Sequence, residues 1–436
     1  MNSCFMKNLL VLSLFICIAY CYNSKAEIKV GYGDVKTDTI SFDLRWGTDK
    51  DKILITQDID LKGAAYKLPP QKILEFKGGK IKNGTIIGNQ TMLKCSGKVF
   101  DRVQIKGTWN VPEISTSMFT DLSYDNALKD VLALAHSKVQ NTIVIEKGDY
   151  YVTAHKNADV CLTVPSNSTL IINGSIRLRP NAFPRCDIVR AKGNNIIICG
   201  NGNIIGDKHT HLGTDGEWGM GIRFHGATNS SVRGLTIRDC WGDCIYVGGN
   251  SKNVTIENCI LDHGRRQGIS VTKADGVIIR GCKISNVNGT NPEYAIDLEP
   301  NPNDTVDHVL IENVDVVNCR GGFQATAGRR NVEKIGKVQI RNCRVSAMNK
   351  YPIRMKNSEY VSIENCTINA TNEKAAIYSK EVHNLVVKDN TINVEKRVAF
   401  TLKNSARKIV GKNVQQPIET IRVRQKDIRE NRIIEY

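Results

Sequence analysis

Short runs that alternate apolar and polar residues recur from about residue 195 to about residue 403, and Val and Ile fill most of their apolar positions. This alternation has a period of two, which is typical of β-strands and differs from the spacing of an amphipathic helix. The runs return at a fixed interval: 23 residues separate Cys259 from Cys282 and Cys343 from Cys366, and 24 separate Cys366 from Asn390. A repeat of this length indicates one structural unit stacked on copies of itself. We therefore predict an all-β fold, a right-handed parallel β-helix, in which the coils of a single-stranded solenoid each contain short strands.

The four cysteines named above share one column of the repeat with Leu235 and Val314. A position that accepts Cys, Leu and Val is typical of a buried apolar ladder. Of the 14 cysteines, Cys4, Cys17 and Cys21 lie near the N-terminus, which leaves an odd number, 11, for the rest of the chain. We therefore expect the ladder cysteines to be reduced core thiols. The sequence contains no CxxC pair with the spacing of a structural zinc site.

The N-terminus has the features of a targeting segment. Lys7 precedes an apolar run from Leu9 to Tyr20, and Ser24 and Ala26 offer small residues at the usual cleavage positions. The run is too short for a membrane span, and no later segment qualifies. We expect residues 1–26 to be a signal peptide and the mature protein to be secreted or periplasmic. A lipoprotein anchored through Cys21 is the alternative, although Tyr20 is a poor residue before a lipidated cysteine.

The remaining chain divides into four parts. Residues 27–112 contain short apolar runs between Lys-Gly and Asn-Gly turns, and they fit either a small β-rich segment or leading coils of the solenoid. Residues 113–150 contain a predicted capping helix, which Ser123 or Asp125 would cap, and the strand that follows it. Residues 151–410 form the predicted solenoid, and residues 411–436 form a basic C-terminal tail or cap.

The formal net charge is +16, which favours an anionic partner. Export makes nucleic acid a poor candidate, so an anionic polysaccharide is the partner that we expect. The excess of Lys and Arg is equally consistent with a solvated outer face of the solenoid. The sequence does not distinguish a monomer from a homotrimer.

Stacking the repeats aligns seven strands, in which a column of Ile or Phe points inward and two columns that follow it along the strands point outward. The first outward column contains Arg223, Tyr246, Ser270, Asp297, Gln324, Arg354 and Tyr378. The second contains His225, Gly248, Thr272, Glu299, Thr326, Lys356 and Lys380. Adjacent coils are about 4.8 Å apart, so these columns should form a flat outer face that is dense in titratable groups. Such a face suits a groove for a sugar chain.

Asp297 and Glu299 lie two residues apart on one predicted strand, so both should face outward, roughly 7 Å apart at Cβ. Glycoside hydrolysis uses two carboxyl groups, about 5 to 5.5 Å apart in retaining enzymes and about 6.5 to 9.5 Å apart in inverting ones. The predicted spacing is compatible with either. An ordinary Asp-x-Glu on a solvated strand is the alternative interpretation.

Two segments carry a resemblance to known families. The sequence from Asp125-Asn-Ala-Leu to Glu146-Lys-Gly-Asp-Tyr-Tyr resembles the first segment of pectate-lyase-superfamily β-helices, in which a short helix plugs the open end of the solenoid. This superfamily includes lyases, hydrolases, epimerases and phage tailspikes, so the resemblance implies a fold rather than a reaction.

The strand Cys244-Ile-Tyr-Val and the order of its coils resemble the polygalacturonase family, which carries Asp-Asp, Gly-His-Gly and Arg-Ile-Lys on successive coils. Here these three motifs are replaced by Gly242-Asp243, Arg266-Gln267-Gly268 and Asp297-Leu298-Glu299. The resemblance carries only Asp243 over as a candidate catalytic acid.

Two loops add further candidates. The segment from His209 to Trp218 contains Glu217, a further acid, and Trp218, an aromatic side chain that could stack on a sugar ring. Arg265 and Arg266 place two guanidinium groups beside the predicted face, where they could bind a carboxylate or a sulfate. No third ligand lies at a spacing from His209 and His211 that would indicate a zinc site, so we predict no metal site.

We therefore expect an exported glycoside hydrolase that acts on an acidic polysaccharide and needs no cofactor. Its predicted catalytic residues are Asp243, Asp297, Glu299 and Tyr246. Its predicted substrate-binding residues are Arg223, His225, Glu217, Trp218, Arg265, Arg266, Gln324, Arg354 and Lys356. The first alternative is a polysaccharide lyase that acts by β-elimination, for which Asp297 and Glu299 would bind Ca²⁺. The second is a protein, similar to a tailspike stalk or an adhesin, that binds glycans without cleaving them.

Overall fold

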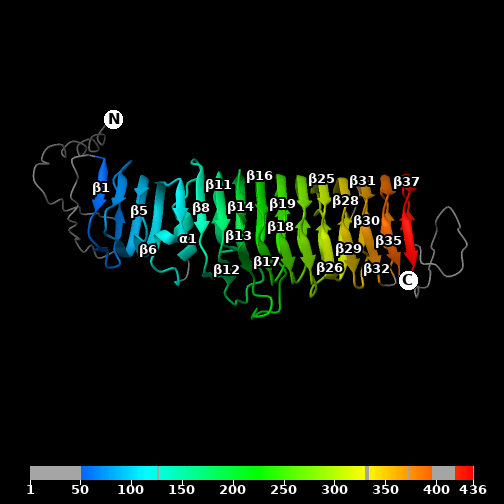
Figure 1. Cartoon of the computed structure of the whole chain (residues 1–436), viewed down its shortest axis with the longest axis horizontal. Helices are drawn as coiled ribbons and strands as arrows, with labels where there is room; N and C mark the ends of the chain where they lie inside the picture. The colour runs from blue at the N-terminus through cyan, green and yellow to red at the C-terminus, as the bar shows by residue number, and fades with distance from the viewer. Residues whose placement is uncertain are drawn as a thin grey trace, which may run out of the picture.

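A computed structural model describes residues 51–124, 127–156, 158–328, 333–371, 374–394 and 418–435. The described chain is an elongated solenoid (Figure 1). Its strands lie across the long axis and follow one another from the N-terminal to the C-terminal end. Within the described residues, every strand pairing of the three sheets is parallel, as a right-handed parallel β-helix requires. The predicted fold class is therefore confirmed. The predicted signal peptide, residues 1–26 with Cys21, lies outside the described residues.

Three sheets make up the solenoid. The N-terminal six-stranded sheet contains β1 (Lys52–Ile55), β2 (Ile59–Asp60), β3 (Ala65–Lys67), β4 (Ile73–Phe76), β5 (Ile81–Lys94) and β6 (Phe100–Asn110). An 11-stranded sheet contains β9 (Asp149–Val152), β12 (Ser175–Leu178), β15 (Asn203–Ile205), β17 (Thr236–Arg238), β20 (Ile260–Asp262), β23 (Lys283–Ser285), β26 (Asp315–Cys319), β29 (Arg344–Ala347), β32 (Thr367–Ala370), β35 (Thr391–Val394) and β38 (Arg432–Glu435).

The 21-stranded sheet bends around the solenoid and forms two of its faces, which share the long strand β16 (Ile222–Arg233). The face that carries the predicted columns, called the site face below, contains β10 (Val160–Val164), β13 (Asp187–Asn194), the first half of β16, β18 (Ile245–Gly248), β21 (Ile269–Val271), β24 (Tyr294–Leu298), β27 (Gly321–Thr326), β30 (Ile353–Lys356), β33 (Ile377–Lys380) and β36 (Ile418–Ile421). The other face contains β7 (Glu113–Ser115), β8 (Asn141–Ile145), β11 (Ser168–Ile172), β14 (Ile197–Gly200), the second half of β16, β19 (Ser251–Glu257), β22 (Ala274–Arg280), β25 (Thr305–Glu312), β28 (Lys334–Arg341), β31 (Ser358–Glu364), β34 (Asn384–Lys388) and β37 (Gln425–Arg429).

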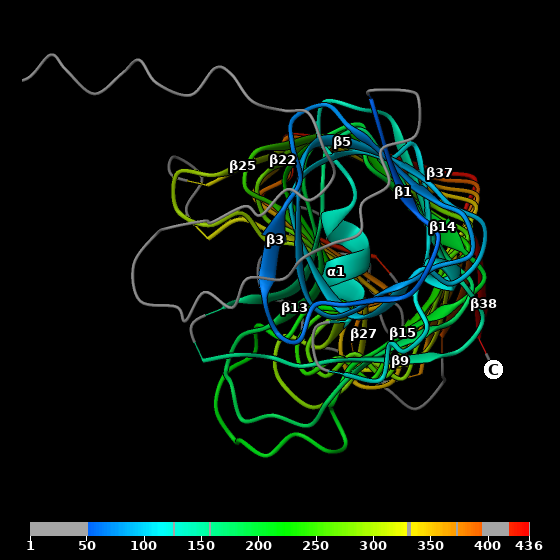
Figure 2. The same ribbon diagram turned by 90° about the vertical axis from the view of Figure 1, so that its left-hand side faces the viewer.

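The core is a stack of apolar columns that runs along the axis. On the site face the inward column contains Ile222, Ile245, Ile269, Ile296, Phe323, Ile353 and Ile377, all fully buried, and each residue pairs with the next. Burying one such side chain stabilises the fold by about 1.5 to 3 kcal/mol. The view along the axis shows the coils superimposed around this interior (Figure 2). The hydrophobic column therefore fixes the register of the coils.

The cysteine column is also buried. Cys259, Cys282, Cys343 and Cys366 are each at most 2% exposed, and none of the 11 described cysteines forms a disulfide bond. The residue before each ladder position adopts a positive φ angle, as in Asn258, Gly281, Asn313, Asn342, Asn365 and Asp389. Asn, Asp and Gly are the residues that adopt this left-handed conformation most readily. The recurring Asn-Cys dipeptide therefore consists of a left-handed corner followed by a core residue.

The helix α1 (Ala127–Ala133) lies between the leading coils and the main solenoid (Figures 1 and 2). Its residues Ala127, Leu128, Val131 and Leu132 are buried, and it packs against β6, β9 and β10. The predicted capping residue Asp125 lies outside the described residues. A short 3₁₀ helix, η1 (Thr116–Met118), precedes it and is capped by the side chain of Ser115. Across the described ranges we find no helix that is long and apolar enough to span a membrane.

Candidate active site

The first outward column has the register that the repeats predicted. Arg223 pairs with Tyr246, Tyr246 with Ser270, Ser270 with Asp297, Asp297 with Gln324, Gln324 with Arg354, and Arg354 with Tyr378. Since Ile296 and Leu298 on either side of Asp297 both belong to the hydrophobic core, Asp297 lies on the outer side of β24. The pairings extend the column by one coil at its N-terminal end, to Arg190 on β13.

Four carboxyl groups surround one guanidinium group near the middle of this face. Arg266 Nε is 3.4 Å from an oxygen of Glu217, its Nη1 is 3.6 Å from Asp243, and its Nη2 is 3.6 Å from Glu299. Asp297 also interacts electrostatically with Arg266. We call Glu217, Asp243, Asp297 and Glu299 the acid cluster. Its residues come from the loop before β16, the turn before β18, and the end of β24, while Arg266 comes from the loop before β21. Glu217 and Glu299, which are 82 residues apart in the sequence, therefore share one site.

The acid cluster has a buried layer and an exposed layer. Asp243 and Asp297 are at most 1% exposed, whereas the side chains of Glu217 and Glu299 are 32% and 46% exposed. The expectation that Asp297 would face solvent is therefore wrong. It lies on the outer side of its strand, but the side chains of Gln267 and Gln324 cover it, which the alternation along the strand could not predict.

Both oxygens of Asp297 accept hydrogen bonds from amide groups. Gln267 Nε2 donates to Oδ2 at 2.6 Å, and Gln324 Nε2 donates to Oδ1 at 3.0 Å. Burial, with the nearby charge of Glu299, raises the pKa of Asp297 to about 8, although Gln324 and Arg266 act in the opposite direction. Asp297 therefore carries a proton at neutral pH, and the exposed carboxyl group of Glu299 lies two residues further along, just after the end of β24.

Asp243 occupies the end of the turn that leads into β18. Neither of its oxygens has a hydrogen-bond partner among the described residues, and its nearest cation is Arg266. Burial raises the pKa of Asp243 to about 6, against the opposing effect of Arg266. A carboxyl group with free oxygens and a pKa near neutrality can exchange protons under physiological conditions.

A hydrogen-bonded chain connects the acid cluster with the next coils. Arg354 Nη1 donates to Gln324 Oε1 at 2.7 Å, and Gln324 in turn donates to Asp297. Lys356 lies two residues further along β30, in the second outward column, and is partly exposed. Gln324, Arg354 and Lys356, which the sequence predicted as binding residues, therefore form the C-terminal side of the site.

Tyr246, Arg223 and His225 form a separate group on the N-terminal side. Arg223 lies over the ring of Tyr246, 4.5 Å from its centroid, and the hydroxyl group of Tyr246 is 2.7 Å from Thr272 Oγ1. Tyr246 is two strand pairings from Asp297, which is about 10 Å at the usual interstrand spacing. The structure therefore does not bring Tyr246 into the acid cluster.

This N-terminal group includes two residues that the sequence analysis missed. Asp187 is fully buried, and it accepts a hydrogen bond of 2.6 Å from Arg190 Nε. Burial raises the pKa of Asp187, against the opposing effects of Arg223 and Arg190. Stacking one more coil, that of β13, onto the predicted column would have identified Arg190.

The loop before β16 carries Glu217 and Trp218, and aromatic stacking holds it in place. The rings of His211 and Trp241 stack with centroids 3.9 Å apart, and Arg265 lies 3.7 Å from the centroid of the Trp241 ring. Arg265 also donates to the carbonyl oxygens of Gly216 and Trp241. Arg265 therefore anchors this loop, and it does not join Arg266 in the acid cluster. Trp218 is 42% exposed and remains able to contact a ligand.

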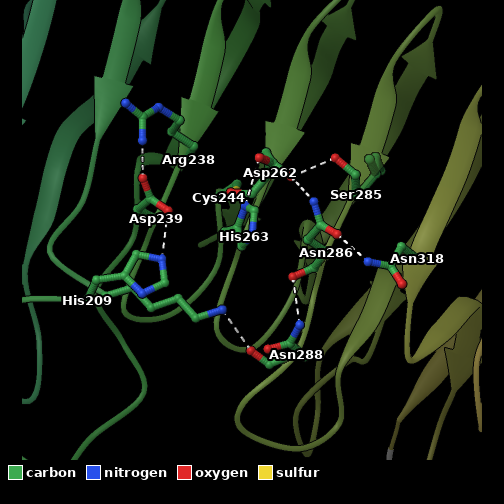
Figure 3. A network of polar contacts seen from close by, with 12 residues as sticks. His209, Arg238, Asp239, Cys244, Asp262, His263, Ser285, Asn286, Asn288 and Asn318 are labelled. Atoms are coloured by element: carbon green, nitrogen blue, oxygen red, sulfur yellow. Dashed lines mark hydrogen bonds and ion pairs between the residues drawn. The ribbon is translucent and has the colours of Figure 1, made fainter.

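A polar network at the adjacent corner of the solenoid positions the same loop (Figure 3). His209 pairs with Asp239, and Lys208 Nζ donates to the carbonyl oxygen of Asn288, in the loop that leads to β24. Asp262 accepts hydrogen bonds from Ser285, Asn286 and His263, and the network continues to Arg238, Cys244 and Asn318. Lys208 thus joins the loop that carries Glu217 to the loop that leads into β24, the strand of Asp297.

The donor set of the acid cluster does not fit a calcium site. The oxygens of Asp297 accept hydrogen bonds from two glutamine amides, and Asp243 and Glu299 lie on one guanidinium group. Within the described ranges no group of three or more His, Cys, Asp and Glu side chains is arranged to bind a metal. His209 and His211 pair with different aspartates, Asp239 and Asp207.

Comparisons with known proteins agree with the fold. The family described as "Right handed beta helix region" matches residues 141–299 and 276–418. Two uncharacterized proteins of Bacillus subtilis (strain 168) are similar to the chain. The SPbeta prophage-derived protein YorA is 29% identical over an alignment of 201 residues, and the match covers 38% of this chain and 34% of YorA. YclG is 29% identical over an alignment of 220 residues, and the match covers 44% of this chain and 38% of YclG. The chain thus spans little more than a third of these relatives.

Among solved structures, the A-module of the mannuronan C-5 epimerase AlgE6 from Azotobacter vinelandii superimposes with a TM-score of 0.50. It is 13% identical to the chain, and the match covers 72% of this chain and 96% of that one. At this identity the similarity concerns the fold alone.

Proposed function

The chain belongs to the right-handed β-helix family, and on that premise we propose that it is a carbohydrate-active enzyme, a glycoside hydrolase that cleaves an anionic polysaccharide at the acid cluster. The single observation that carries this proposal is the pairing of a buried carboxyl group, Asp297 on β24, with an exposed one, Glu299, which lies two residues further along and directly after the strand. Glycoside hydrolysis requires one carboxyl group that supplies a proton and one that acts as base or nucleophile.

The two carboxyl groups differ in the property that this chemistry needs. With its pKa raised to about 8 by burial, Asp297 holds a proton at neutral pH. In the proposed reaction it is the acid, and it supplies this proton to the leaving sugar after the side chain of Gln324, which covers it, moves aside. Glu299 is 46% exposed and lies 3.6 Å from Arg266, so a substrate can reach it. Glu299 is therefore the base or nucleophile, and it contacts the sugar.

The other residues of the site bind the substrate. Glu217 lies 3.4 Å from Arg266 Nε and is partly exposed, and Trp218 offers a ring for stacking on a sugar. Arg354 and Lys356 supply positive charge on the C-terminal side of the acid cluster. An anionic polymer also agrees with the net charge of +16. The predicted signal peptide supports the further proposal that the enzyme acts after export. N-terminal sequencing of the mature protein would test this, since a chain that starts after Ala26 is expected.

The proposed activity is tested by incubating the protein with a panel of anionic and neutral polysaccharides and measuring new reducing ends. We expect products from at least one anionic polymer. Asp297→Asn should lower the rate by about 10²- to 10⁴-fold, which is the usual contribution of a positioned acid or base. Glu312→Gln, which removes a carboxylate paired with Arg341 on another face, is the matched control and should keep full activity. Glycan binding without products, or full activity of Asp297→Asn, would contradict the proposal.

A second candidate function is β-elimination, and His225 is the observation that favours it. Burial and the nearby Arg223 lower the pKa of His225, so the imidazole is neutral and able to accept a proton. Arg223 could neutralise the carboxylate of a uronate next to the abstracted proton. This reaction would produce unsaturated ends that absorb ultraviolet light. His225→Gln would abolish them, whereas Asp297→Asn would not.

A further inference from the structure

A basic site lies on the same face as the acid cluster, towards the N-terminal end of the solenoid. We call Asp187, Arg190, Arg223 and His225 the basic subsite. Arg190 and Arg223 are neighbours in the first outward column, and both are paired with Asp187, whose side chain is fully buried. One carboxylate thus faces two guanidinium groups, and the side chain of Lys192 adds a further positive charge near His225. The subsite is therefore positively charged overall.

Arg223 is held in a fixed position, but its guanidinium group does not use all of its hydrogen-bond donors. Its Nη1 is 3.6 Å from Asp187, beyond hydrogen-bond distance, and its Nε has no hydrogen-bond partner among the described residues. The ring of Tyr246 supports the guanidinium from the next strand. The side chains of Arg190 and Arg223 are 21% and 17% exposed, so a ligand can reach them. Arg190 already donates to Asp187 and to the carbonyl oxygen of Asp159, and the Nε of Arg223 is buried. The exposed part of the Arg223 guanidinium is therefore the group that is suited to binding a carboxylate or a sulfate.

The basic subsite and the acid cluster are a fixed distance apart. Arg223 and Asp297 are three strand pairings apart in one column, which is about 14 Å at 4.8 Å per pairing. At the acid cluster the exposed carboxylates of Glu217 and Glu299 would repel a negatively charged sugar, because Arg266 is the single guanidinium group that they share. The face therefore favours a negative charge at one position and disfavours it at the other.

We propose that this face recognises a heteropolysaccharide in which charged and uncharged sugars alternate. The basic subsite binds a carboxylate or sulfate of one sugar, while the acid cluster holds an uncharged sugar about three coils away. The position of the uncharged sugar as the one attacked rests on the proposed function, whereas the recognition of the anion at Arg223 and Arg190 does not. A polymer that carries a charge on every sugar is the poorer ligand, because it places a carboxylate against Glu217 and Glu299.

Affinity electrophoresis tests this proposal by binding alone. The Asp297→Asn protein, which cannot consume the ligand by the proposed reaction, is run through gels that contain hyaluronan, gellan, polygalacturonate or dextran. Hyaluronan alternates charged and uncharged sugars, gellan carries one charged sugar in four, polygalacturonate is charged on every sugar, and dextran is uncharged. We expect the strongest retention by hyaluronan, and at least tenfold weaker binding when Arg223→Gln is added. Arg341→Gln removes the same charge from an exposed position on another face, and it should bind as the parent does.

Two further results decide the proposal. Glu299→Gln should strengthen the binding of polygalacturonate, because it removes one of the repelling charges. The proposal is overturned if hyaluronan is retained no more than dextran or polygalacturonate, or if Arg341→Gln weakens binding as much as Arg223→Gln, since the net charge would then be the cause. If retention depends on Arg223 but the unsubstituted protein releases no products from these polymers, the hydrolase proposal fails and the basic subsite stands. If the unsubstituted protein releases products but Arg223→Gln leaves binding unchanged, the basic subsite fails and the hydrolase proposal stands.

Discussion

At the scale of single residues, Asp243 and Asp297 have pKa values near 6 and near 8, whereas an aspartate in an unfolded chain titrates near 3.9. In both cases the main cause is burial, which disfavours the charged carboxylate. The site therefore combines one acid that holds its proton at neutral pH, one that titrates near pH 6 and two exposed glutamates, and this combination gives the site its proposed chemistry.

The raised pKa of Asp297 predicts a specific dependence of stability on pH. Because the folded chain binds this proton more tightly than the unfolded chain does, its contribution to stability is complete below about pH 4 and is lost as the pH rises through about 8. The melting temperature should therefore fall between these values. Asp297→Asn should reduce the slope and leave the part below about pH 6 that Asp243 contributes. Asp315→Asn, an exposed position on the 11-stranded sheet, should keep the full slope, and an unchanged slope in Asp297→Asn would contradict the assignment.

Arg266 predicts a second effect of the acid cluster. Arg266→Met removes the cation shared by Glu217, Asp243 and Glu299, and breaking a buried pair of this kind costs about 3 to 5 kcal/mol. The carboxyl groups can offset part of this cost by binding protons. The loss of unfolding free energy, measured by denaturant titration, should therefore be larger at pH 8 than at pH 5. An equal loss at both pH values, or the same loss in Arg341→Met, would show that Arg266 does not balance these charges.

At the scale of strands and turns, the sequence determined the register because an error of one residue would expose the whole inward column. Ile222, Ile245 and Ile269 could therefore be aligned correctly without coordinates. Loops follow no such pattern. The position of Glu217 beside Arg266 depends on how the loop before β16 folds over Trp241, and this could not be predicted. The burial of Asp297 depends on the side chain of Gln324 from the next coil.

The left-handed corners before the cysteine ladder allow a prediction at this scale. Asn342 is exposed and has a φ angle of 57°. A β-branched residue in this conformation is strained by about 1 to 2 kcal/mol, whereas Gly adopts it without steric cost. We expect Asn342→Val to lower the unfolding free energy by about that amount and Asn342→Gly to be close to neutral in chemical denaturation. The same pair of substitutions at Ser346, on the neighbouring strand β29, should show the opposite order, because Val suits an extended strand.

At the scale of the whole molecule, each coil buries its apolar face only against its two neighbours, so stability is a sum of local interfaces. The site benefits from this arrangement, because ten strands of one face can carry binding residues while the interior columns hold the register. The separation between the acid cluster and the basic subsite is set by counting coils. Such a surface can therefore select a polymer that lies along the axis by the spacing of its charged groups.

The same locality predicts how damage in the core should spread. Phe323 is fully buried between Ile296 and Ile353 of the adjacent coils, and replacing a buried Phe with Ala costs about 3 to 5 kcal/mol. In a solenoid this cost falls on nearby interfaces, so hydrogen exchange measured by mass spectrometry should accelerate in β24, β27 and β30, while β11 and β12 remain protected. Arg341→Ala, an exposed change on β28, should leave exchange in all five strands unchanged. If protection fell equally from β11 to β34, the coils would unfold as one cooperative unit. This result would contradict the view that each coil is stabilised only by its neighbours.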